Sequence, residues 1–495
     1  MFVTPKQMQL LEKLTDDSGI SYAEMMERAG CALAEFIENS PAAEHSAVLL
    51  AGSGNNGGDC YVAAAQLHLA GWKVQVLAPF GEPKTEISRN AAEHAKSCGV
   101  AVVHEADEFL SSAAVVVDGL FGTGFRGELP QEAVTLLAPR QGQLRIAADI
   151  PSGGSGLTGS VSDGTFRADM TVTFGAVKLG MSQYPLREFC GTVRCVDIGI
   201  PASAFDALQP SAAKCLKLEE VRSLLPSLRP DAHKNSRGHL LTIAGSVRMR
   251  GACVLAATAA MRSGCGLQTT ASAEPALQAI CGSIPEIMCL PLETDERGFF
   301  LDGENHGLLS DALHGKNALL IGCGMGVTEN TRNLTKFLLR HSDCPIILDA
   351  DGLNCIGTCI EWIPKGRTVL TPHPGEAARL LGMTAAQVQA DRPYAARLLA
   401  EKCGAVVVLK GAGTVISDGE RMAVCMDGNV GLARAGSGDV LAGITASLAA
   451  QGMELYDAAC AAVTLHACAG DAAARRLPVG FMLPQDVIAA LQEVL

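Results

Sequence analysis

The sequence predicts two α/β domains in one chain, the first of them a doubly wound parallel sheet. The chain has 495 residues, which is too long for a single ordinary hydrophobic core. Ala, Val, Leu and Gly are abundant while aromatic residues make up only 4%, as expected where small side chains pack helices onto parallel strands. Short apolar runs alternate with helical patterns twice along the chain, with a break between the two series.

The first half opens with two expected helices and continues as alternating strands and helices. The expected strands are near-continuous apolar runs, which is typical of strands covered by helices on both faces. In a doubly wound sheet, ligands bind beyond the carboxyl ends of the strands. The expected helices span residues 6–14 and 22–38, and the expected strands span residues 48–51, 74–78, 115–118, 146–149 and 170–174.

The alternation breaks at residues 200–213, which are rich in Pro, Ala and Ser, and we place the linker there. The two domains are therefore expected to span residues 1–210 and 211–495. The second half resumes the alternation and ends in long helices. Its expected strands span residues 239–244, 318–321, 346–349 and 406–409, with a hairpin-like pair near Val415 and Met422, and its expected helices span residues 252–262, 440–450 and 456–475.

The composition restricts the class of partner. The formal net charge is -13 and the pI is about 5.4, which argues against a nucleic acid or an anionic membrane as the main partner. No apolar stretch reaches the roughly 20 residues of a spanning helix, and no signal peptide is evident. The 18 cysteines are scattered without CxxC pairs, as expected for reduced thiols used as small hydrophobes. We therefore expect a cytoplasmic protein that acts on small molecules.

Three loops of the first half follow expected strands directly. Residues 52–60 (GSGNNGGDC), 118–128 (DGLFGTGFRGE) and 149–156 (DIPSGGSG) each carry acidic or amide groups among glycines. Glycines at a strand-to-helix turn let the backbone approach a ligand closely, and a helix N-terminus favours anions. The glycine pattern of the first loop is a weak signal when taken alone. The coincidence of three such loops predicts a site for a polar, phosphorylated ligand.

Four side chains in these loops are candidates for chemistry. Asn56, Asp118 and Ser152 could converge as oxygen ligands, and a small number of neutral and singly charged oxygens suits a monovalent cation. Asp149, at the end of an expected strand, is a candidate general acid or base. The alternative is that these residues only cap helices and form turns, which Asp, Ser and Asn commonly do.

The second half has a glycine-rich turn of its own. Residues 436–439 (GSGD) open the expected helix at residues 440–450. Free backbone N–H groups and the helix dipole can hold a phosphoryl oxygen there, with the Asp439 carboxylate beside it. Such a pairing suits phosphoryl transfer to a hydroxyl group, in which one group removes the proton and others stabilise the phosphate charge. The alternative is a plain helix N-terminus with an Asp in its first turn.

Other short runs of the second half agree with a phosphate site. Lys410 ends a strand and leads into a glycine turn, and His373 lies between two prolines that stiffen the backbone. Gly324 belongs to a glycine-rich run (GCGMG) after the strand at residues 318–321. Asp349 and Asp351 belong to the run DADGLN and could help to hold magnesium.

At this point the motifs indicate a family. The runs GNNGGD at 54–59, DGLFGTG at 118–124 and DIPSG at 149–153 resemble the NAD(P)H-hydrate epimerase family. The second half is similar to the NAD(P)H-hydrate dehydratase family, which has a ribokinase-like fold. Fused in this order, the two halves resemble the bifunctional NAD(P)H-hydrate repair enzymes over nearly the whole chain. The resemblance implies a Rossmann-like epimerase domain followed by a ribokinase-like dehydratase domain.

For the first domain, the resemblance implies interconversion of the R and S forms of NADHX and NADPHX. Asp149 would drive the reaction, and a potassium ion would be bound by Asn56, Asp118 and Ser152. Two departures from the family pattern are Cys60, where Gly is usual, and Arg126, where Lys is common. Because Arg cannot donate a proton near neutral pH, Arg126 should only contact the substrate. The implied hydrate-binding residues are Asn55, Asn56, Gly57, Gly58, Asp59, Gly122, Thr123, Gly124, Phe125, Arg126, Gly127, Glu128 and Asp149.

For the second domain, the resemblance implies dehydration of the S form at the expense of ADP, with magnesium, giving AMP and phosphate. Asp439 would deprotonate the hydroxyl group at carbon 6. Ala244 and Val430 depart from the family pattern, but neither change removes a proton-transfer group, so activity is still expected. We also expect a homo-oligomer, of unspecified size. The implied hydrate contacts are Ala252, Gly324, His373 and Asp439, and the implied nucleotide contacts are Lys410, Gly411, Ala412, Gly413, Thr414 and Gly438.

Two other functions stay open on the sequence. The second domain could be a vitamin or sugar kinase, because such kinases share the ribokinase-like fold and the GSGD loop. The first domain could bind a nucleotide or a partner without catalysing a reaction. A stable phosphorylated product would favour the kinase, whereas recovery of reduced nicotinamide would favour the dehydratase.

Overall fold

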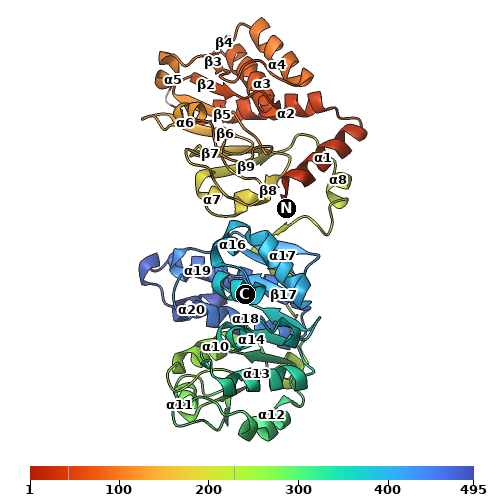
Figure 1. Cartoon of the computed structure of the whole chain (residues 1–495), viewed down its shortest axis with the longest axis vertical. Helices are drawn as coiled ribbons and strands as arrows, with labels where there is room; N and C mark the ends of the chain where they lie inside the picture. Colours follow the sequence, from red (N-terminus) through yellow and green to blue (C-terminus); the bar gives the residue numbers. More distant parts are fainter. Residues whose placement is uncertain (43, 228) are drawn as a thin grey trace. The chain divides into compact units, whose positions relative to one another are not determined.

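The structure is a computed structural model that describes residues 1–42, 44–227 and 229–495. The chain divides into two compact units, Met1–Ala213 and Lys214–Leu495, coloured red to yellow and green to blue in Figure 1. The division falls at the C-terminal end of residues 200–213, where the sequence places the linker. That segment is nevertheless structured, since it contains α8 (Ala202–Asp206) and Ala213 exchanges backbone hydrogen bonds with Phe2.

The first unit is built on a parallel sheet of seven strands in the order β4-β3-β2-β5-β6-β7-β9. The chain enters this sheet in the middle, at β2, and adds strands first toward one edge and then toward the other. The crevice at such a reversal, beyond the carboxyl ends of β2 and β5, is where ligands bind in this fold class. The strands are β2 (Ser46–Ala51), β3 (Lys73–Leu77), β4 (Ala101–Val103), β5 (Val115–Gly119), β6 (Leu144–Ala148), β7 (Met170–Phe174) and β9 (Thr192–Val196).

Helices cover both faces of this sheet. Ala47 and Leu49 of β2 pack in one core with the first four helices, whereas Val48 and Leu50 pack in another core with α5 and α6. Successive strand residues point to opposite faces, so the apolar run at residues 47–51 of β2 requires a helix layer on each side. The helices are α1 (Pro5–Asp17), α2 (Tyr22–Glu38), α3 (Asn55–Leu69), α4 (Glu86–Ser97), α5 (Glu108–Ser112), α6 (Gln131–Leu137) and α7 (Leu186–Phe189), most of them labelled in Figure 1.

The first unit also contains a two-stranded parallel sheet, which includes the first residues of the chain. β1 (Phe2–Val3) pairs with β8 (Val177–Lys178), so that Val3 lies opposite Lys178. The helix α1 follows at once, capped at Thr4 with Pro5 in its first turn. This pairing places α1 beside the strand that carries Lys178.

The second unit contains a ten-stranded sheet in the order β10-β19-β18-β17-β16-β15-β14-β11-β12-β13. Its neighbours are parallel except for the hairpin strands β17, β18 and β19, which pair antiparallel. The expected hairpin near Val415 and Met422 is therefore confirmed. The strands are β10 (Lys214–Cys215), β11 (His239–Ile243), β12 (Leu267–Ser272), β13 (Met288–Pro291), β14 (Ala318–Ile321), β15 (Ile346–Leu348), β16 (Thr368–Leu370), β17 (Val406–Leu409), β18 (Thr414–Ser417) and β19 (Met422–Cys425).

Both faces of this sheet are buried as well. One face packs on an Ala-rich core formed largely by α10, α18, α19 and α20, and alternate residues such as Leu319 and Ile321 are buried on the other face. The long helix α18 is buried almost all round, as expected of an apolar helix in the centre of a unit. The helices are α9 (Leu218–Leu224), α10 (Arg250–Arg262), α11 (Glu274–Ser283), α12 (His306–Leu313), α13 (Glu329–His341), α14 (Ala350–Ile356), α15 (Pro374–Leu381), α16 (Ala385–Ala390), α17 (Arg392–Cys403), α18 (Ser437–Ala450), α19 (Leu455–Ala474) and α20 (Pro484–Val494).

The α/β class predicted for both halves is confirmed, while some element ends differ. Asp149 and Asp349, expected as the last residues of strands, lie just beyond β6 and β15. Asp149 leaves the strand because its φ is 66°, in the left-handed region. Among the described residues, no helix combines the length and the apolar character needed to cross a membrane.

Candidate active sites

In the first unit, the glycine-rich loop after β2 packs directly on the loop after β5. A Cβ atom at Gly52 would overlap the carbonyl oxygen of Leu120, and one at Gly57 would overlap the carbonyl oxygen of Gly52. Gly119 leaves room for the thiol of Cys60, which is fully buried. The glycines are therefore required by close backbone packing. Cys60, which stands where the family usually has Gly, packs its thiol in the core against Gly119.

Asp118 and Ser152 form a buried pair at the carboxyl ends of β5 and β6. The Ser152 hydroxyl donates to Asp118 Oδ1 at 2.6 Å, and the Ser152 backbone N–H donates to Oδ2 at 2.7 Å. Burial raises the pKa of Asp118 to about 6, and the hydrogen bonds from Ser152 oppose this rise. Asn56 lies beside this pair, because a Cβ at Gly119 would be 3.1 Å from the Asn56 carbonyl oxygen. The side-chain nitrogen of Asn56 is buried without a hydrogen-bond partner among the described residues.

Asp149 is held by one of its two carboxylate oxygens. Oδ1 accepts from the Thr173 hydroxyl at 3.1 Å, from the Phe174 N–H at 3.2 Å and from the Lys178 ammonium. Lys178 is only 1% exposed and also donates to Thr173 Oγ1 and to the Phe174 carbonyl, each at 3.0 Å. No described residue donates a hydrogen bond to Asp149 Oδ2 at normal distance. The arrangement pairs Asp149 with a buried lysine through one oxygen and leaves the other oxygen available for a ligand.

Two further carboxyl groups lie within electrostatic range of Asp149. Burial raises the pKa of Glu12 to about 7, and the charge of Asp149 adds to the rise while Lys178 opposes it. Burial and the charges of Asp149 and Glu12 raise the pKa of Asp59 well above its usual range. The site thus places a lysine-paired carboxylate near two carboxyl groups whose pKa values are raised. Such a difference is what separates a general base from a general acid.

The remaining predicted residues of the first unit lie in the same loops. Asn55 Oδ1 accepts a hydrogen bond from the Thr85 hydroxyl at 2.7 Å. The exposed Arg126 donates to the carbonyl oxygens of Thr123 at 3.1 Å and Phe125 at 2.6 Å. In this structure Arg126 therefore stabilises its own loop, and its guanidinium remains at the surface where a ligand could reach it.

In the second unit, the carboxyl end of β15 carries a buried ion pair. Asp349 is 1% exposed, and its Oδ1 accepts from the Lys410 ammonium at 2.6 Å and from the Thr371 hydroxyl at 2.7 Å. Burial works against the charge of Lys410, but Asp349 and Glu376 outweigh it and raise the pKa of Lys410. Lys410, which the sequence predicts to bind phosphate, is thus already paired with Asp349 in this structure.

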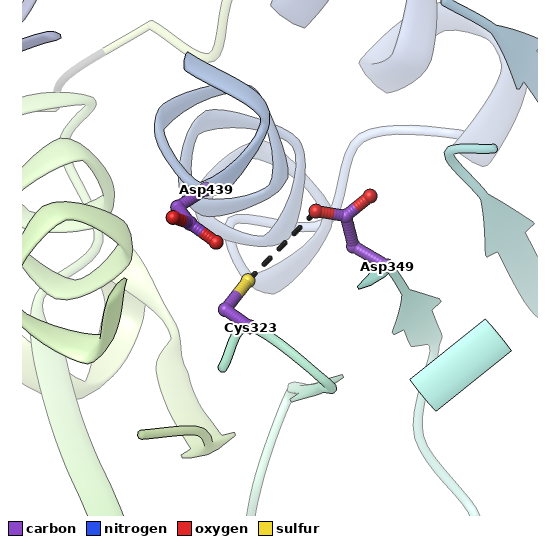
Figure 2. A group of neighbouring side chains, drawn as sticks. All are labelled: Cys323, Asp349 and Asp439. Atoms are coloured by element: carbon purple, nitrogen blue, oxygen red, sulfur yellow. Dashed lines mark hydrogen bonds between the residues drawn. The ribbon is translucent and has the colours of Figure 1, made fainter. Parts of the chain in front are cut away.

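Asp439 lies in the first turn of α18, after Gly436, whose φ is 97°. Burial raises the pKa of Asp439 to about 7, and the nearby charge of Asp349 contributes to the rise. Figure 2 shows these two carboxylates with the thiol of Cys323, which follows β14. One ligand atom from each of the three residues lies within 4.8 Å of the others. A carboxyl group that titrates near neutral pH at a helix N-terminus is suited to general base catalysis.

The other predicted residues of the second unit lie close to this centre in pairs. A Cβ at Gly438 would be 3.2 Å from Lys410 Nζ, and one at Gly324 would be 2.7 Å from the Cβ of Ala252. His373 caps α15, since its Nδ1 accepts from the Gly375 N–H at 3.0 Å. Its other ring nitrogen, Nε2, lies 3.5 Å from Oε1 of Glu376.

Sequence reasoning missed three charged residues that the structure places at the sites. Glu12 and Lys178 surround Asp149, as described above. Arg392, which is buried, donates to the carbonyl oxygens of Leu409 at 3.0 Å and Lys410 at 3.3 Å, at the start of the predicted nucleotide loop 410–414. The only signal for Lys178 was a lysine within an apolar run, and nothing in the sequence marked Arg392.

Comparisons with known proteins give the family. The family described as YjeF-related protein N-terminus matches residues 22–180, and the NAD(P)H-hydrate dehydratase family matches residues 240–493. Among solved structures, a ribokinase-like superfamily protein from Enterococcus faecalis is 24% identical with a TM-score of 0.51. It covers 57% of this chain and 94% of its own. This likeness supports the ribokinase-like fold of the second unit.

Full-length relatives carry both halves in the same order. A bifunctional NAD(P)H-hydrate repair enzyme from Coxiella burnetii is 36% identical over 478 residues, covering 95% of this chain and 94% of the relative. One from Escherichia coli is 33% identical over 486 residues, covering 97% and 90%. These matches confirm the resemblance drawn from the motifs. The chain belongs to the family of bifunctional NAD(P)H-hydrate repair enzymes.

Proposed function

We propose that the chain is a two-step repair enzyme for hydrated NADH and NADPH. The first unit interconverts the R and S forms of the hydrate at carbon 6. The second unit dehydrates the S form to NAD(P)H at the expense of ADP, which gives AMP and phosphate. The observation that carries this proposal is the presence of two separate carboxylate centres, one in each unit, each at the carboxyl ends of parallel strands.

In the epimerisation, Asp149 acts as the general base through Oδ2. Lys178, Thr173 and the Phe174 N–H donate to Oδ1 and leave Oδ2 for the substrate. Removal of the carbon 6 hydroxyl proton, with protonation of the ring nitrogen, opens the ring, and closure onto the other face gives the opposite configuration. Asp59, whose pKa is raised well above its usual range, is the neutral carboxyl group suited to supply that proton.

The residues Asn56, Asp118 and Ser152 fit a potassium ion. The buried Asn56 amide has a nitrogen without an acceptor, and exchange of its nitrogen and oxygen would present an oxygen that a cation satisfies. Asp118 supplies a buried carboxylate and Ser152 a hydroxyl oxygen. The ion would neutralise Asp118 and order the loops around the hydrate. Asn55, Gly57, Gly58, Asp59 and residues 122–128 line the remainder of this cradle.

In the dehydration, Asp439 takes the proton from the carbon 6 hydroxyl, whose oxygen then attacks the terminal phosphoryl group of ADP. AMP leaves with the electrons of the broken bond, and the phosphorylated hydrate eliminates phosphate to restore the dihydronicotinamide ring. Gly438 and the start of α18 present N–H groups to the transferred phosphoryl oxygens. Lys410 and the loop 411–414, positioned by Arg392, contact the nucleotide, and Ala252, Gly324 and His373 contact the hydrate.

Magnesium fits this centre as a companion of ADP. Asp349 already bonds Lys410 and Thr371, and Asp351 Oδ2 accepts from the Gly326 N–H at 2.8 Å. The described residues at this centre therefore do not provide an all-protein set of oxygens for a hard cation. Mg²⁺ commonly binds through one or two carboxylates together with substrate phosphates. We propose that it neutralises the ADP phosphates in the same way here.

The test uses NADH hydrate prepared enzymatically as a mixture of R and S forms. With ADP, the intact chain should restore the near-ultraviolet absorbance of the reduced nicotinamide from both forms. Asp149→Asn should convert only the S form, and Asp439→Ala should convert neither. A stoichiometric, stable phosphorylated product without recovery of absorbance would instead identify a kinase. Undiminished R-to-S conversion by Asp149→Asn would remove Asp149 as the base.

A further inference from the structure

We propose that Cys323, Asp349 and Asp439 form a binding site for a thiophilic divalent cation such as Zn²⁺. The thiol lies between two carboxylates at the centre of the second unit, each from a different segment: the loop after β14, the end of β15 and the first turn of α18 (Figure 2). One ligand atom of each residue lies within 4.8 Å of the other two. A sulfur and two carboxylate oxygens are a ligand set that Zn²⁺ accepts.

The geometry needs little rearrangement. Zn–S and Zn–O bonds of about 2.3 Å and 2.1 Å imply ligand separations of about 3.4–3.8 Å in a tetrahedral site. The three atoms must therefore approach by about one ångström from their present spacing, which side-chain rotation can supply.

The buried Asp349 has one oxygen in need of a partner. Its Oδ1 accepts two strong hydrogen bonds, from Lys410 and Thr371. Among the described residues, Oδ2 accepts a hydrogen bond only from the Cys323 thiol, with sulfur and oxygen 4.0 Å apart, and it also lies near the first turn of α18, since a Cβ at Gly438 would be 3.7 Å from it. A thiol at this distance is a weak donor, and a buried carboxylate oxygen left with such a donor is under-satisfied. A cation between Oδ2 and the sulfur would satisfy it.

Charge balance favours a divalent ion that displaces the thiol proton. With Cys323 as thiolate, the three ligands carry three negative charges, and Lys410 offsets one of them. A divalent cation brings the cluster to neutrality, which lowers the cost of burying it. Metal binding releases the thiol proton to solvent. Sulfur selects Zn²⁺, Cd²⁺ or Co²⁺ over Mg²⁺, which prefers six oxygen ligands.

Occupation of this site has a consequence for the reaction, and that consequence rests on the proposed function. A cation bound to the Asp439 carboxylate prevents it from taking the proton of the substrate hydroxyl. Zn²⁺ should therefore inhibit dehydration through Cys323 and leave epimerisation in the first unit unaffected. The binding itself does not depend on what the enzyme dehydrates.

The test is a titration of the full chain with Co²⁺, whose bond to a thiolate gives a near-ultraviolet charge-transfer band. The sulfurs of Cys281 and Cys289 lie 3.5 Å apart near the surface and could also bind the ion. The titration is therefore made in a Cys281→Ser background. Cys323→Ser is compared with Cys403→Ser, a matched change of another buried cysteine. We expect one equivalent of Co²⁺ to produce the band, Zn²⁺ to bleach it, and only Cys323→Ser to abolish it.

A band that survives Cys323→Ser, or no sulfur band at one equivalent, would overturn the proposal. If Cys323→Ser does not fold, Asp439→Ala replaces it and should weaken or abolish the band, and an unchanged band would again overturn the site. The ratio of dehydration rates with and without Zn²⁺ is then measured within each variant. A Cys323-dependent band in a chain that shows no dehydration would support the metal site and count against the proposed function instead.

Discussion

Asp349→Asn is expected to lower the pH at which the dehydratase centre becomes active. Burial and the charge of Asp349 raise the pKa of Asp439 to about 7. The closest atoms of these carboxylates lie within 4.8 Å, and two charges at that distance repel by about 3.5 kcal/mol at an effective dielectric constant of about 20. Lys410, 2.6 Å from Asp349, cancels part of this repulsion. A net shift of about 1–2 pKa units, or about 1.4–2.7 kcal/mol, remains.

The sign follows from the proposed role of Asp439 as a base. The protonated carboxyl cannot remove a proton, so kcat/KM for dehydration rises with pH through the pKa of Asp439 in the free enzyme. In Asp349→Asn, that rise should move from about 7 to about 5–6. Near pH 6 the ionised fraction of Asp439 would grow from about one tenth to at least about one half. The readout is the recovery of reduced nicotinamide absorbance from S hydrate and ADP, measured as a pH profile.

Two matched variants separate this electrostatic effect from general damage to the site. Asp351→Asn makes the same change two positions away, and its charge is a minor contributor to the pKa of Asp439, so the profile should move only slightly. Lys410→Met removes a cation that lowers the pKa of Asp439, so the profile should move to higher pH. A profile of Asp349→Asn that stays at about 7 or moves upward would refute the reasoning, whatever the absolute rates.

Three further predictions concern the other parts of the two sites. Lys178→Met should lower the rate of epimerisation by at least about 10²-fold, because Asp149 loses its counter-charge. Conversion of pure S hydrate should be unchanged. A normal R-to-S rate would contradict the assignment of Lys178 to the epimerase site. Asn56→Ala should abolish activation of epimerisation by K⁺ over a bulky monovalent cation, and retained activation would remove Asn56 from the ion site. Arg392→Met should raise KM for ADP by about tenfold, because the loop 410–414 loses buried charge-assisted hydrogen bonds; an unchanged KM for ADP would show that the loop orders itself.

The strands that carry the sites could be predicted because they are buried on both faces. β17 (Val406–Leu409) is an apolar run throughout. β5 (Val115–Gly119) begins with three valines and ends with Asp118 and Gly119. β12 (Leu267–Ser272) was missed because it buries Gln, Thr and Ser side chains, which read as a loop. β9 (Thr192–Val196) was missed because it lies at an edge of its sheet and is largely exposed. Apolar periodicity thus identifies central strands better than polar or edge strands.

The candidate site residues also differ in whether a local sequence pattern marks them. Asp149 and Asp439 could be proposed as candidates from the sequence because each follows a recognisable strand or opens a recognisable helix among glycines. Glu12 and Lys178 could not be placed, since they meet Asp149 through the pairing of β1 with β8, a contact between chain segments far apart in sequence. The thiol of Cys323 was likewise read only as part of a glycine run. Long-range pairing of short strands leaves no local pattern in the sequence.

Both centres pair a buried lysine with an aspartate at the end of a strand, but they use the pair in different ways. In the first unit Lys178 donates directly to Asp149, the carboxylate that we propose as the base. In the second unit Lys410 bonds Asp349, whose charge acts on the neighbouring Asp439. Under the proposed mechanism, removing Lys178 acts on the first base directly, whereas removing Lys410 shifts the pH at which the second base works in addition to removing a nucleotide contact. The same kind of ion pair can therefore hold a proposed base directly in one fold and shift the pKa of a neighbouring base in another. The difference depends on whether the lysine pairs with the carboxylate that faces the substrate or with the carboxylate beside it.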